Sequence, residues 1–421
     1  MKQTQNTRIQ ISQSVEATMS HIKLILTNMA FLILIACGLP CAGSGEIATQ
    51  PDTSTIPFGL PGHALNRTVI DTDLPGAYQV EIADVNGDNK LDIIALGGGT
   101  VAWYENPKWT KRIVSDKKTS PGVISTATRD IDGDGKAEIA IAYEFEMNNP
   151  KLGKLLMARQ KGEGWVYESL GDFPSIHRLR WGDFDGDGKP DLAIAPIFGK
   201  SATGPDFQQE GARLEVLFGG SLAGRSEVDH KLVTHAIGVI PGPAQNRTTN
   251  FLSASNEGIW QHGFANQKWE NRQILVGAGG ERPKTGCSEI HLGKFADGRH
   301  FYATIEPWHG SDVVIQPERT KGSPQLGPRF VIDTTLKEAH ALCVADIDGD
   351  GTDEVFAGYR GPGFGLNAYR LEAGTWKRLV IDSKIASQDL RTADINGDGL
   401  MDVVSVGGST KNVVLYQATK K

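Results

Sequence analysis

Short apolar stretches that alternate with polar residues recur along most of the chain and predict β-strands. Turns rich in Gly, Asp and Asn separate them, which accounts for the 50 glycines among 421 residues. The clearest predicted strands are VAWYENP at 101–107, LEVLFGG at 214–220, LNAYRLE at 366–372 and NVVLYQA at 412–418. Shorter ones are predicted at KRIVSD (111–116), RFVID (329–333) and KRLVID (377–382). The pattern predicts an all-β protein.

One sequence motif occurs five times. It reads DVNGDNKLDIIAL from Asp84, DIDGDGKAEIAIA from Asp130, DFDGDGKPDLAIA from Asp183, DIDGDGTDEVFAG from Asp346 and DINGDGLMDVVSV from Asp394. Two weaker copies fill the long interval between the third and fourth motifs. One is EIHLGKFADGRHFYATIEPWHG at 289–310, with Asp297 in place of the first Asp, and the other is TNFLSASNEGIW at 249–260. The repeats therefore predict seven units of four strands.

Repeated four-stranded units of this length are typical of propeller blades. The segment RTVID at 67–71 comes before the first unit but matches the strand that lies between later units. We expect it to complete the last blade beside NVVLYQA. The predicted fold is a seven-bladed β-propeller over residues 67–421.

Residues 1–42 are typical of an export signal. The apolar run FLILIA at 31–36 follows Lys23, and it is too short to span a bilayer as a mature helix. Residues 34–37 resemble the bacterial lipobox, in which Cys37 would be acylated; ordinary cleavage near residues 42–44 and an uncleaved anchor are the alternatives. Each places the chain outside the cytoplasm, in the periplasm, on the cell surface or in the medium. Residues 43–66 are rich in Gly, Ser, Thr and Pro and predict a flexible tether.

Composition excludes some classes of protein. The formal net charge is −7, so there is no basic excess to neutralise nucleic-acid phosphates, and membrane contact is expected only through the possible lipid anchor. Charged residues are 22% of the chain and well mixed, which argues against wholesale disorder. Beyond the signal only Cys287 and Cys343 remain. Two thiols make no disulfide framework, and we expect small buried hydrophobic side chains.

The repeated motif places side-chain oxygens at positions 1, 3, 5 and 9 of a tight, Gly-bearing turn. Crowded hard oxygens suit Ca²⁺, as in the EF-hand loop, although strands rather than helices flank these turns. We expect five Ca²⁺ ions and none in the two weaker units; the alternative is acidic turns without metal. The expected ligands are Asp84, Asn86, Asp88, Asp92, Asp130, Asp132, Asp134, Glu138, Asp183, Asp185, Asp187, Asp191, Asp346, Asp348, Asp350, Glu354, Asp394, Asn396, Asp398 and Asp402.

These loops resemble the FG-GAP/VCBS repeat family, whose best-known members are the integrin α-subunit propellers. The resemblance covers residues 68–421 and implies Ca²⁺ on one face of the propeller. Asn89 departs from the pattern, since it replaces the second Gly of the first loop. Such propellers adhere, scaffold or catalyse, so the resemblance implies fold and metal more than function.

Histidines gather at one position of the units, in a chain with only 10 of them. Six residues before the first loop Asp lie Tyr78, Ile124, His177, His291, His340 and Gln388. Six residues of strand span roughly 20 Å, so these side chains should line the channel mouth on the face opposite the calcium. His235 occupies a similar place in the fourth unit, and loops on that face carry Glu306, His309 and Arg360.

Convergent imidazoles can bind a second divalent metal (Zn²⁺, Mn²⁺ or Mg²⁺) or act as acid–base groups. The alternative is that these histidines pack and form hydrogen bonds in a tight channel. Trp181 and Trp308 are expected to be exposed, where their rings could stack on sugars.

The pattern H-x5-D, IEPWHG and H-x5-D-x-D-G-D-G-x-x-E-x-x-x-G-Y-R over residues 177–361 resembles the propeller of aldos-2-ulose dehydratase-like proteins. That resemblance implies a lyase or isomerase acting on oxidised sugars, with metal in the channel. It transfers functional roles to His177, His235, His291, Glu306, His309, His340 and Arg360. The expected function is that of an exported, carbohydrate-active lyase or dehydratase with a sugar-derived ligand. The alternative is a non-catalytic adhesion propeller that binds carbohydrate or an extracellular protein.

Overall fold

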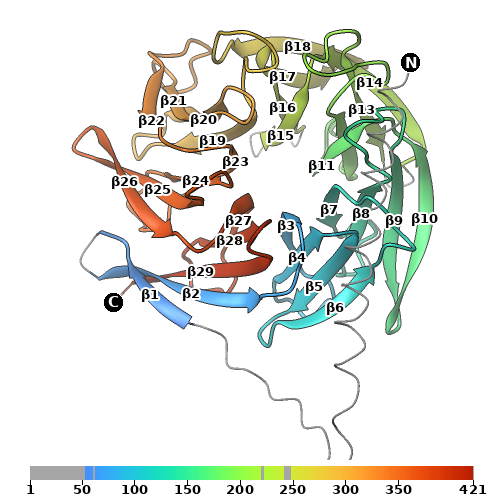
Figure 1. The fold of residues 1–421 in the computed structure, drawn as a ribbon, viewed down its shortest axis with the longest axis horizontal. Coiled ribbons are helices and arrows are strands. Elements are labelled where there is room, and N and C mark those ends of the chain that lie inside the picture. The colour runs from blue at the N-terminus through green and yellow to red at the C-terminus, as the bar shows by residue number, and fades with distance from the viewer. Residues whose placement is uncertain (1–52, 60–61, 220–221, 241–247, 421) are drawn as a thin grey trace, which may run out of the picture. The chain divides into compact units, whose positions relative to one another are not determined.

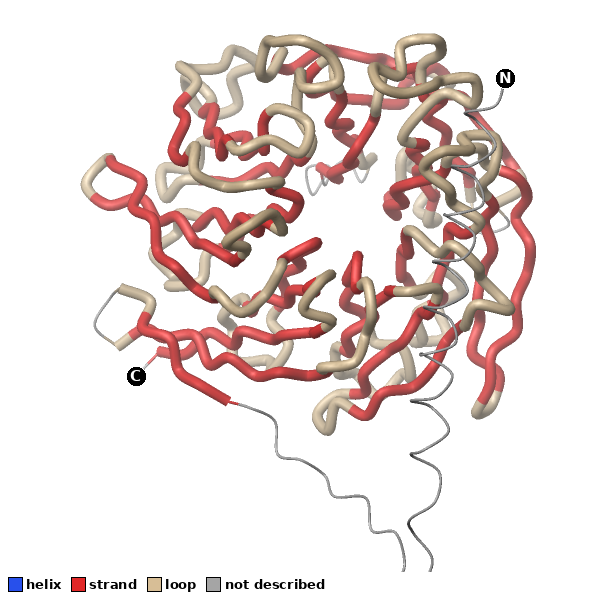
Figure 2. The backbone as a smooth tube through the Cα atoms, viewed as in Figure 1, coloured by secondary structure: helices blue, strands red, loops and turns tan. Residues whose placement is uncertain are grey.

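The computed structural model describes residues 53–59, 62–219, 222–240 and 248–420. These residues form strands β1 to β29 without a helix, and Figure 2 shows the strands joined by turns and loops. Within them, no helical segment has the length and apolar character needed to cross a membrane. The expected signal at 1–42 lies outside the described residues.

The strands form seven sheets around a central axis (Figure 1). Each innermost strand contacts the innermost strands of both neighbouring blades, and the contact of β27 with β3 closes the ring. The prediction of an all-β, seven-bladed propeller is confirmed.

Six blades are antiparallel sheets of four consecutive strands. Blade one consists of β3 (Ala77–Ala83), β4 (Asp92–Gly97), β5 (Thr100–Glu105) and β6 (Thr110–Ser115). Blade two consists of β7 (Ser125–Arg129), β8 (Glu138–Tyr143), β9 (Lys154–Lys161) and β10 (Gly164–Asp172). Blade three consists of β11 (Ile176–Gly182), β12 (Asp191–Pro196), β13 (Ala212–Phe218) and β14 (Gly224–Lys231). Blade four consists of β15 (Thr234–Ile240), β16 (Asn250–Ser255), β17 (Gly258–Ala265) and β18 (Lys268–Leu275). Blade five consists of β19 (Glu289–Lys294), β20 (His300–Glu306), β21 (Asp312–Pro317) and β22 (Phe330–Asp333). Blade six consists of β23 (Ala339–Ala345), β24 (Glu354–Tyr359), β25 (Gly365–Glu372) and β26 (Thr375–Asp382).

The seventh blade joins the two ends of the propeller. Its order is β27 (Ser387–Ala393), β28 (Asp402–Gly407), β29 (Asn412–Lys420), β2 (His63–Asp71) and β1 (Thr53–Pro57). Val69 of β2 pairs with Val414 of β29, so the predicted closure is confirmed. Part of the expected tether at 43–66 is not a tether, because β1 and the start of β2 lie within it. A Ser/Thr-rich segment with Pro at its end can still hydrogen-bond as an edge strand.

Hydrogen bonds between Tyr and Asp link neighbouring blades. In three pairs the phenol of a blade's third strand donates to an Asp that ends the fourth strand of the preceding blade: Tyr104 to Asp71 at 2.6 Å, Tyr369 to Asp333 at 2.8 Å and Tyr416 to Asp382 at 2.7 Å. Apolar clusters fill the space between the sheets, as where Val404 and Val406 pack with Ile93 and Ala95. These contacts hold the inner strands, and hence the channel wall, in fixed positions.

Five of the seven innermost strands carry a β-bulge at their second residue. The bulged residues are Tyr78, His177, His235, His340 and Gln388. A bulge interrupts the alternation of side chains, so a bulged residue and the one after it can both face the channel. This repeated irregularity positions the candidate site.

Candidate active site and acidic loops

Three buried imidazoles lie at the starts of β11, β15 and β23. His177 Nδ1 donates to the His235 carbonyl at 3.1 Å, His235 Nδ1 to the Ser288 carbonyl at 3.0 Å, and His340 Nδ1 to the Gln388 carbonyl at 2.7 Å. A carbonyl only accepts, so each Nδ1 carries the proton and each Nε2 carries a lone pair. Fixing the tautomer in this way is the usual arrangement around metal-binding histidines.

His309 joins this group from the loop after β20. Its Nε2 lies 2.9 Å from His235 Nε2, and one ring nitrogen each of His235, His309 and His340 lie within 4.8 Å of one another. Lys284 Nζ donates to the carbonyls of Trp308 at 3.1 Å and His309 at 3.3 Å. His309 has a φ of 47°, a conformation that non-glycine residues seldom adopt outside functional or tightly held turns.

Arg360 follows β24 and lies at the edge of the imidazole group. Its Nη1 donates to Gln388 Oε1 at 3.0 Å, its Nε to Glu338 Oε2 at 3.4 Å, and its Nη2 lies 3.4 Å from His309 Nδ1. A guanidinium only donates, so His309 Nδ1 accepts here and its own proton is on Nε2. In this state His309 donates to the lone pair of His235.

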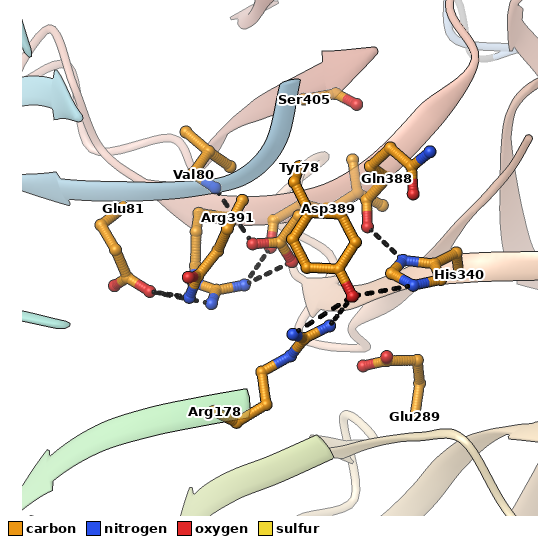
Figure 3. Close-up of polar contacts among 12 residues, drawn as sticks. Tyr78, Val80, Glu81, Arg178, Glu289, His340, Gln388, Asp389, Arg391 and Ser405 are labelled. Carbon is orange, nitrogen blue, oxygen red and sulfur yellow. Dashed lines mark hydrogen bonds and ion pairs between the residues drawn. The ribbon is translucent and has the colours of Figure 1, made fainter. Parts of the chain in front are cut away.

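Tyr78 and Arg178 complete the group on the opposite side. Tyr78 Oη lies 3.0 Å from His177 Nε2 and 3.4 Å from His340 Nε2. Arg178 Nη1 lies 3.1 Å from His177 Nε2, and Arg178 Nη2 donates to Tyr78 Oη at 3.4 Å. Figure 3 shows the phenol between Arg178 and His340. Because Arg178 only donates, the Tyr78 proton is available to an imidazole nitrogen.

Burial keeps these imidazoles neutral. It is the largest cause that lowers the pKa of His177, His235, His309 and His340. The positive charge of Arg178 lowers all four pKa values further, and that of Arg360 lowers those of the last three. A neutral imidazole offers a lone pair. The group therefore suits metal ligation or proton abstraction rather than proton donation.

A layer of charged side chains lies on the same inner strands (Figure 3). Arg391 donates to Glu81 at 3.0 Å and to Asp389 at 2.9 Å, and Arg180 donates to Glu81 at 3.3 Å. Glu289 lies 3.0 Å from His235 Nδ1, and burial raises its pKa to about 8. Sequence reasoning missed this layer, although Arg178 and Arg180, at alternate positions of RLRWGD (178–183) on an inner strand, were a signal for it.

Two of the seven expected site residues lie elsewhere. His291 is two residues beyond Glu289 on β19, a strand without a bulge, and its pKa falls to about 3 through burial and the charges of Arg391 and Arg180. It therefore belongs with the charged layer. Buried Glu306 accepts from Thr304 at 2.8 Å and from Arg329 at 2.6 Å, so it is paired away from the imidazoles.

The remaining five expected residues, His177, His235, His309, His340 and Arg360, are gathered at one end of the channel. The expectation that Trp181 and Trp308 are exposed is wrong, since they are 9% and 6% exposed. Trp308 packs edge-on against Phe198 and Phe207, which stack on each other at 3.9 Å. Its ring supports the loop of His309 and is not free to stack on a sugar.

The acidic loops share one hydrogen-bond pattern. In the second loop Asp130 accepts from the backbone N–H groups of Gly133 at 2.7 Å and Gly135 at 2.9 Å, and Glu138 accepts from Ile131 N–H at 3.0 Å. The equivalent ninth-position contact recurs in the other four loops, made by Asp92, Asp191, Glu354 and Asp402. Acidic oxygens lie within 4.8 Å of one another in three groups: Asp130, Asp132 and Glu138; Asp183, Asp185 and Asp191; Asp346, Asp348 and Glu354.

The chemistry of these loops fits a bound cation. Burial, with repulsion from neighbouring carboxylates, raises the pKa of Asp92 to about 6, of Asp402 to about 7 and of Glu354 to about 9. Asp348 Oδ2 is buried without a hydrogen-bond partner, and Arg370 Nη1 lies 3.9 Å away. Bound Ca²⁺ would satisfy such oxygens.

The two weaker units differ. In the fifth blade Asp297 pairs with Arg299 at 2.8 Å in a short turn, and among the described residues no acidic set surrounds it. The expected absence of Ca²⁺ there stays a prediction. The corresponding loop of the fourth blade includes residues 241–247, which lie outside the described residues.

Another buried histidine, His262, forms a triad-like series of hydrogen bonds in the fourth blade. Ser253 Oγ lies 2.8 Å from His262 Nε2, and His262 Nδ1 lies 2.8 Å from Asn271 Oδ1. Ser253 and His262 are both 0% exposed and lie on adjacent strands β16 and β17. No substrate can reach this hydroxyl, so the hydrogen bonds among Ser253, His262 and Asn271 form a structural cross-strand network.

Comparison with known proteins agrees with the fold. The FG-GAP-like repeat family model matches residues 84–141, 130–194 and 346–405, which together contain all five acidic loops. Aldos-2-ulose dehydratase of Phanerodontia chrysosporium is 23% identical over 394 residues, which is 80% of this chain and 43% of that protein. This chain thus spans less than half the length of that relative.

Two solved structures share the architecture at low identity. The extracellular domain of the putative one component system BT4673 from B. thetaiotaomicron has a TM-score of 0.51 at 9% identity, over 82% of this chain and 39% of that one. BBS1N, solved in complex with ARL6DN, has a TM-score of 0.50 at 11% identity, over 83% of this chain and 94% of that one. This chain is a seven-bladed β-propeller that carries FG-GAP-like repeats.

Proposed function

We propose that this chain is an exported propeller lyase, which removes water from an oxidised sugar at the imidazole end of its channel. One observation carries the proposal: His235, His309 and His340 bring three ring nitrogens within 4.8 Å from separate parts of the chain. The likeness to a relative named aldos-2-ulose dehydratase, over 80% of this chain, supports the substrate class.

His235, His309 and His340 would hold a divalent metal. An all-nitrogen donor set favours Zn²⁺ over Mn²⁺ and Mg²⁺, which prefer oxygen. When bound, the metal would supply a Lewis acid for the sugar carbonyl. His309 would then carry its proton on Nδ1, and its 3.4 Å contact with Arg360 would be lost.

The neighbouring side chains can move the protons that dehydration requires. His177 Nε2 would take the proton from the carbon next to the carbonyl, and the carbon–oxygen bond at the next carbon would break. The departing oxygen would take the Tyr78 phenol proton and leave as water. The 3.0 Å contact between Tyr78 Oη and His177 Nε2 then returns the proton to the phenol.

The substrate test uses D-glucosone, an aldos-2-ulose, with purified protein of measured metal content. We expect an ultraviolet-absorbing unsaturated ketone, confirmed by NMR, with wild type and no product with His177→Ala or Tyr78→Phe. His291→Ala is the control and should retain product formation. Absence of product from folded, metal-loaded wild type would contradict the proposal and favour the non-catalytic binding propeller.

The same proposal assigns Ca²⁺ to the five acidic loops, as stabilising ions remote from the chemistry. The buried Asp348 oxygen without a hydrogen-bond partner supports this assignment most directly. Export with an acylated Cys37 is part of the proposal and rests on the sequence of residues 34–37.

A further inference from the structure

Arg178 is a buried guanidinium that forms no ion pair with a carboxylate of the described residues. The residue is 6% exposed, and its hydrogen bonds go to Tyr78 Oη, His177 Nε2 and the His177 carbonyl. Among the described residues, no carboxylate oxygen lies within 4.0 Å of the Arg178 guanidinium, which is the limit for an ion pair. Buried charges in proteins are normally paired, because an isolated one costs several kcal/mol.

The other arginines of the channel are paired. Arg180 and Arg391 share Glu81, and Arg391 also binds Asp389. Glu289 is directed to His235. The charges of Glu289 and Asp389 act on Arg178 at longer range and raise its pKa, but neither forms an ion pair with it, and its guanidinium points toward Tyr78 (Figure 3).

Two further cations lie beside the imidazoles. Arg360 lies 3.4 Å from His309, and among the described residues its carboxylate contact is to Glu338, whose side chain is 59% exposed. Lys284 donates to the backbone carbonyls of Trp308 and His309, and burial lowers its pKa. This end of the channel thus carries more positive than negative groups and would attract an anion.

We infer that Arg178 binds the carboxylate of a sugar acid, so that the site prefers a sugar that bears a carboxylate to a neutral one. The inference rests on the proposed function for placing a sugar at the imidazoles. A guanidinium fork matches a carboxylate in two parallel hydrogen bonds. One unpaired buried guanidinium balances one negative charge, which suits a carboxylate better than a phosphate dianion.

The test is calorimetric titration of the full calcium-loaded chain with D-galacturonate, D-galactose and D-galactose 6-phosphate. The first two differ only in the carboxylate at carbon 6. We expect wild type to bind galacturonate at least tenfold more tightly than galactose. Arg178→Gln should lose most of that preference, and Arg178→Lys should retain a reduced one. Arg180→Gln, two residues away on the same strand but paired with Glu81, should keep it.

Equal binding of galactose and galacturonate by wild type would overturn the inference, and that comparison requires no variant to fold. Equal losses in Arg178→Gln and Arg180→Gln would also overturn it, as would tightest binding of the phosphate. Binding is measured without turnover, so the two proposals can fail separately. If wild type dehydrates neutral D-glucosone but shows no preference for galacturonate, only this inference is refuted. If wild type prefers galacturonate but does not dehydrate D-glucosone, only the lyase proposal is refuted.

Discussion

His235 Nε2 and His309 Nε2 lie 2.9 Å apart, although His235 is on β15 and His309 is on a loop after β20. Two lone pairs cannot face each other at this distance, so a proton or a cation must lie between them. The contact from Arg360 to His309 Nδ1 favours a proton on His309 Nε2 in the metal-free protein. Metal binding should therefore displace that hydrogen bond.

His309→Ala should remove the channel metal while leaving Ca²⁺ in place. His309 is partly exposed on a loop and has a φ of 47°, so its loss should cost little stability, about 1 kcal/mol. Elemental analysis should find Zn²⁺ or Mn²⁺ falling from about one per chain to background, and the melting temperature should shift by a few degrees.

The matched control is His291→Ala, which removes a channel imidazole outside the group. It should keep the transition metal. Full metal retention in His309→Ala, or equal loss in both variants, would rule out the three-imidazole site.

The repeat pattern in the sequence was sufficient to predict the propeller, its closure and part of the site. Counting six residues back from the loop Asp found Tyr78, His177 and His340, because the bulge recurs at the same distance from those loops. The same count misplaced His291, because β19 has no bulge. A bulge follows from backbone pairing between strands, which single-sequence periodicity does not reveal.

The direction of the Arg178 guanidinium toward Tyr78 and His177 could not be predicted for the same reason. It follows His177 directly, and consecutive strand residues normally point to opposite faces. Glu306 was misplaced because its partner Arg329 comes from the connection before β22 and is distant in sequence. The exposure of Trp308 was misjudged because the long loop at 196–211 packs Phe198 and Phe207 against its ring.

Removal of Ca²⁺ should destabilise the propeller. Binding to the folded state alone adds about 2.7 kcal/mol per site at a free calcium concentration one hundred times Kd. Excess EDTA should lower the melting temperature markedly, and elemental analysis of the calcium-loaded protein should give about five Ca²⁺ per chain. Glu354→Gln should lose one ion and part of the stabilisation by calcium.

Asp297→Asn is the matched control for the calcium sites, because Asp297 occupies the degenerate fifth loop and pairs with Arg299. It should leave the calcium content and the EDTA effect unchanged. An unaltered melt in EDTA, with no metal retained, would refute structural calcium.

Cys37→Ala tests the lipid anchor. If Cys37 is acylated, the wild-type protein should partition with membranes, because acyl chains bury in lipid. The variant should move to the soluble envelope fraction or the medium. Fractionation with immunodetection measures this, and Cys343→Ala, which removes a buried thiol of β23, is the control. Unchanged partitioning of Cys37→Ala would exclude the lipobox interpretation.

Acid should destabilise the fold through His262. Burial lowers its pKa from 6.5 to about 4, so the unfolded chain takes up a proton at a higher pH than the folded chain does. The stability that the neutral His262 imidazole contributes to the fold is therefore complete above about pH 6.5 and is lost as the pH falls toward 4. Between pH 7 and pH 5 the loss should be roughly 2 kcal/mol in the free energy of unfolding.

Urea denaturation at both pH values, with wild type and His262→Gln, isolates this contribution, because the other buried histidines are common to both proteins. His300→Gln, which removes a partly exposed histidine of β20, is the control. Equal pH dependence in wild type and His262→Gln would show that His262 is not held neutral between Ser253 and Asn271.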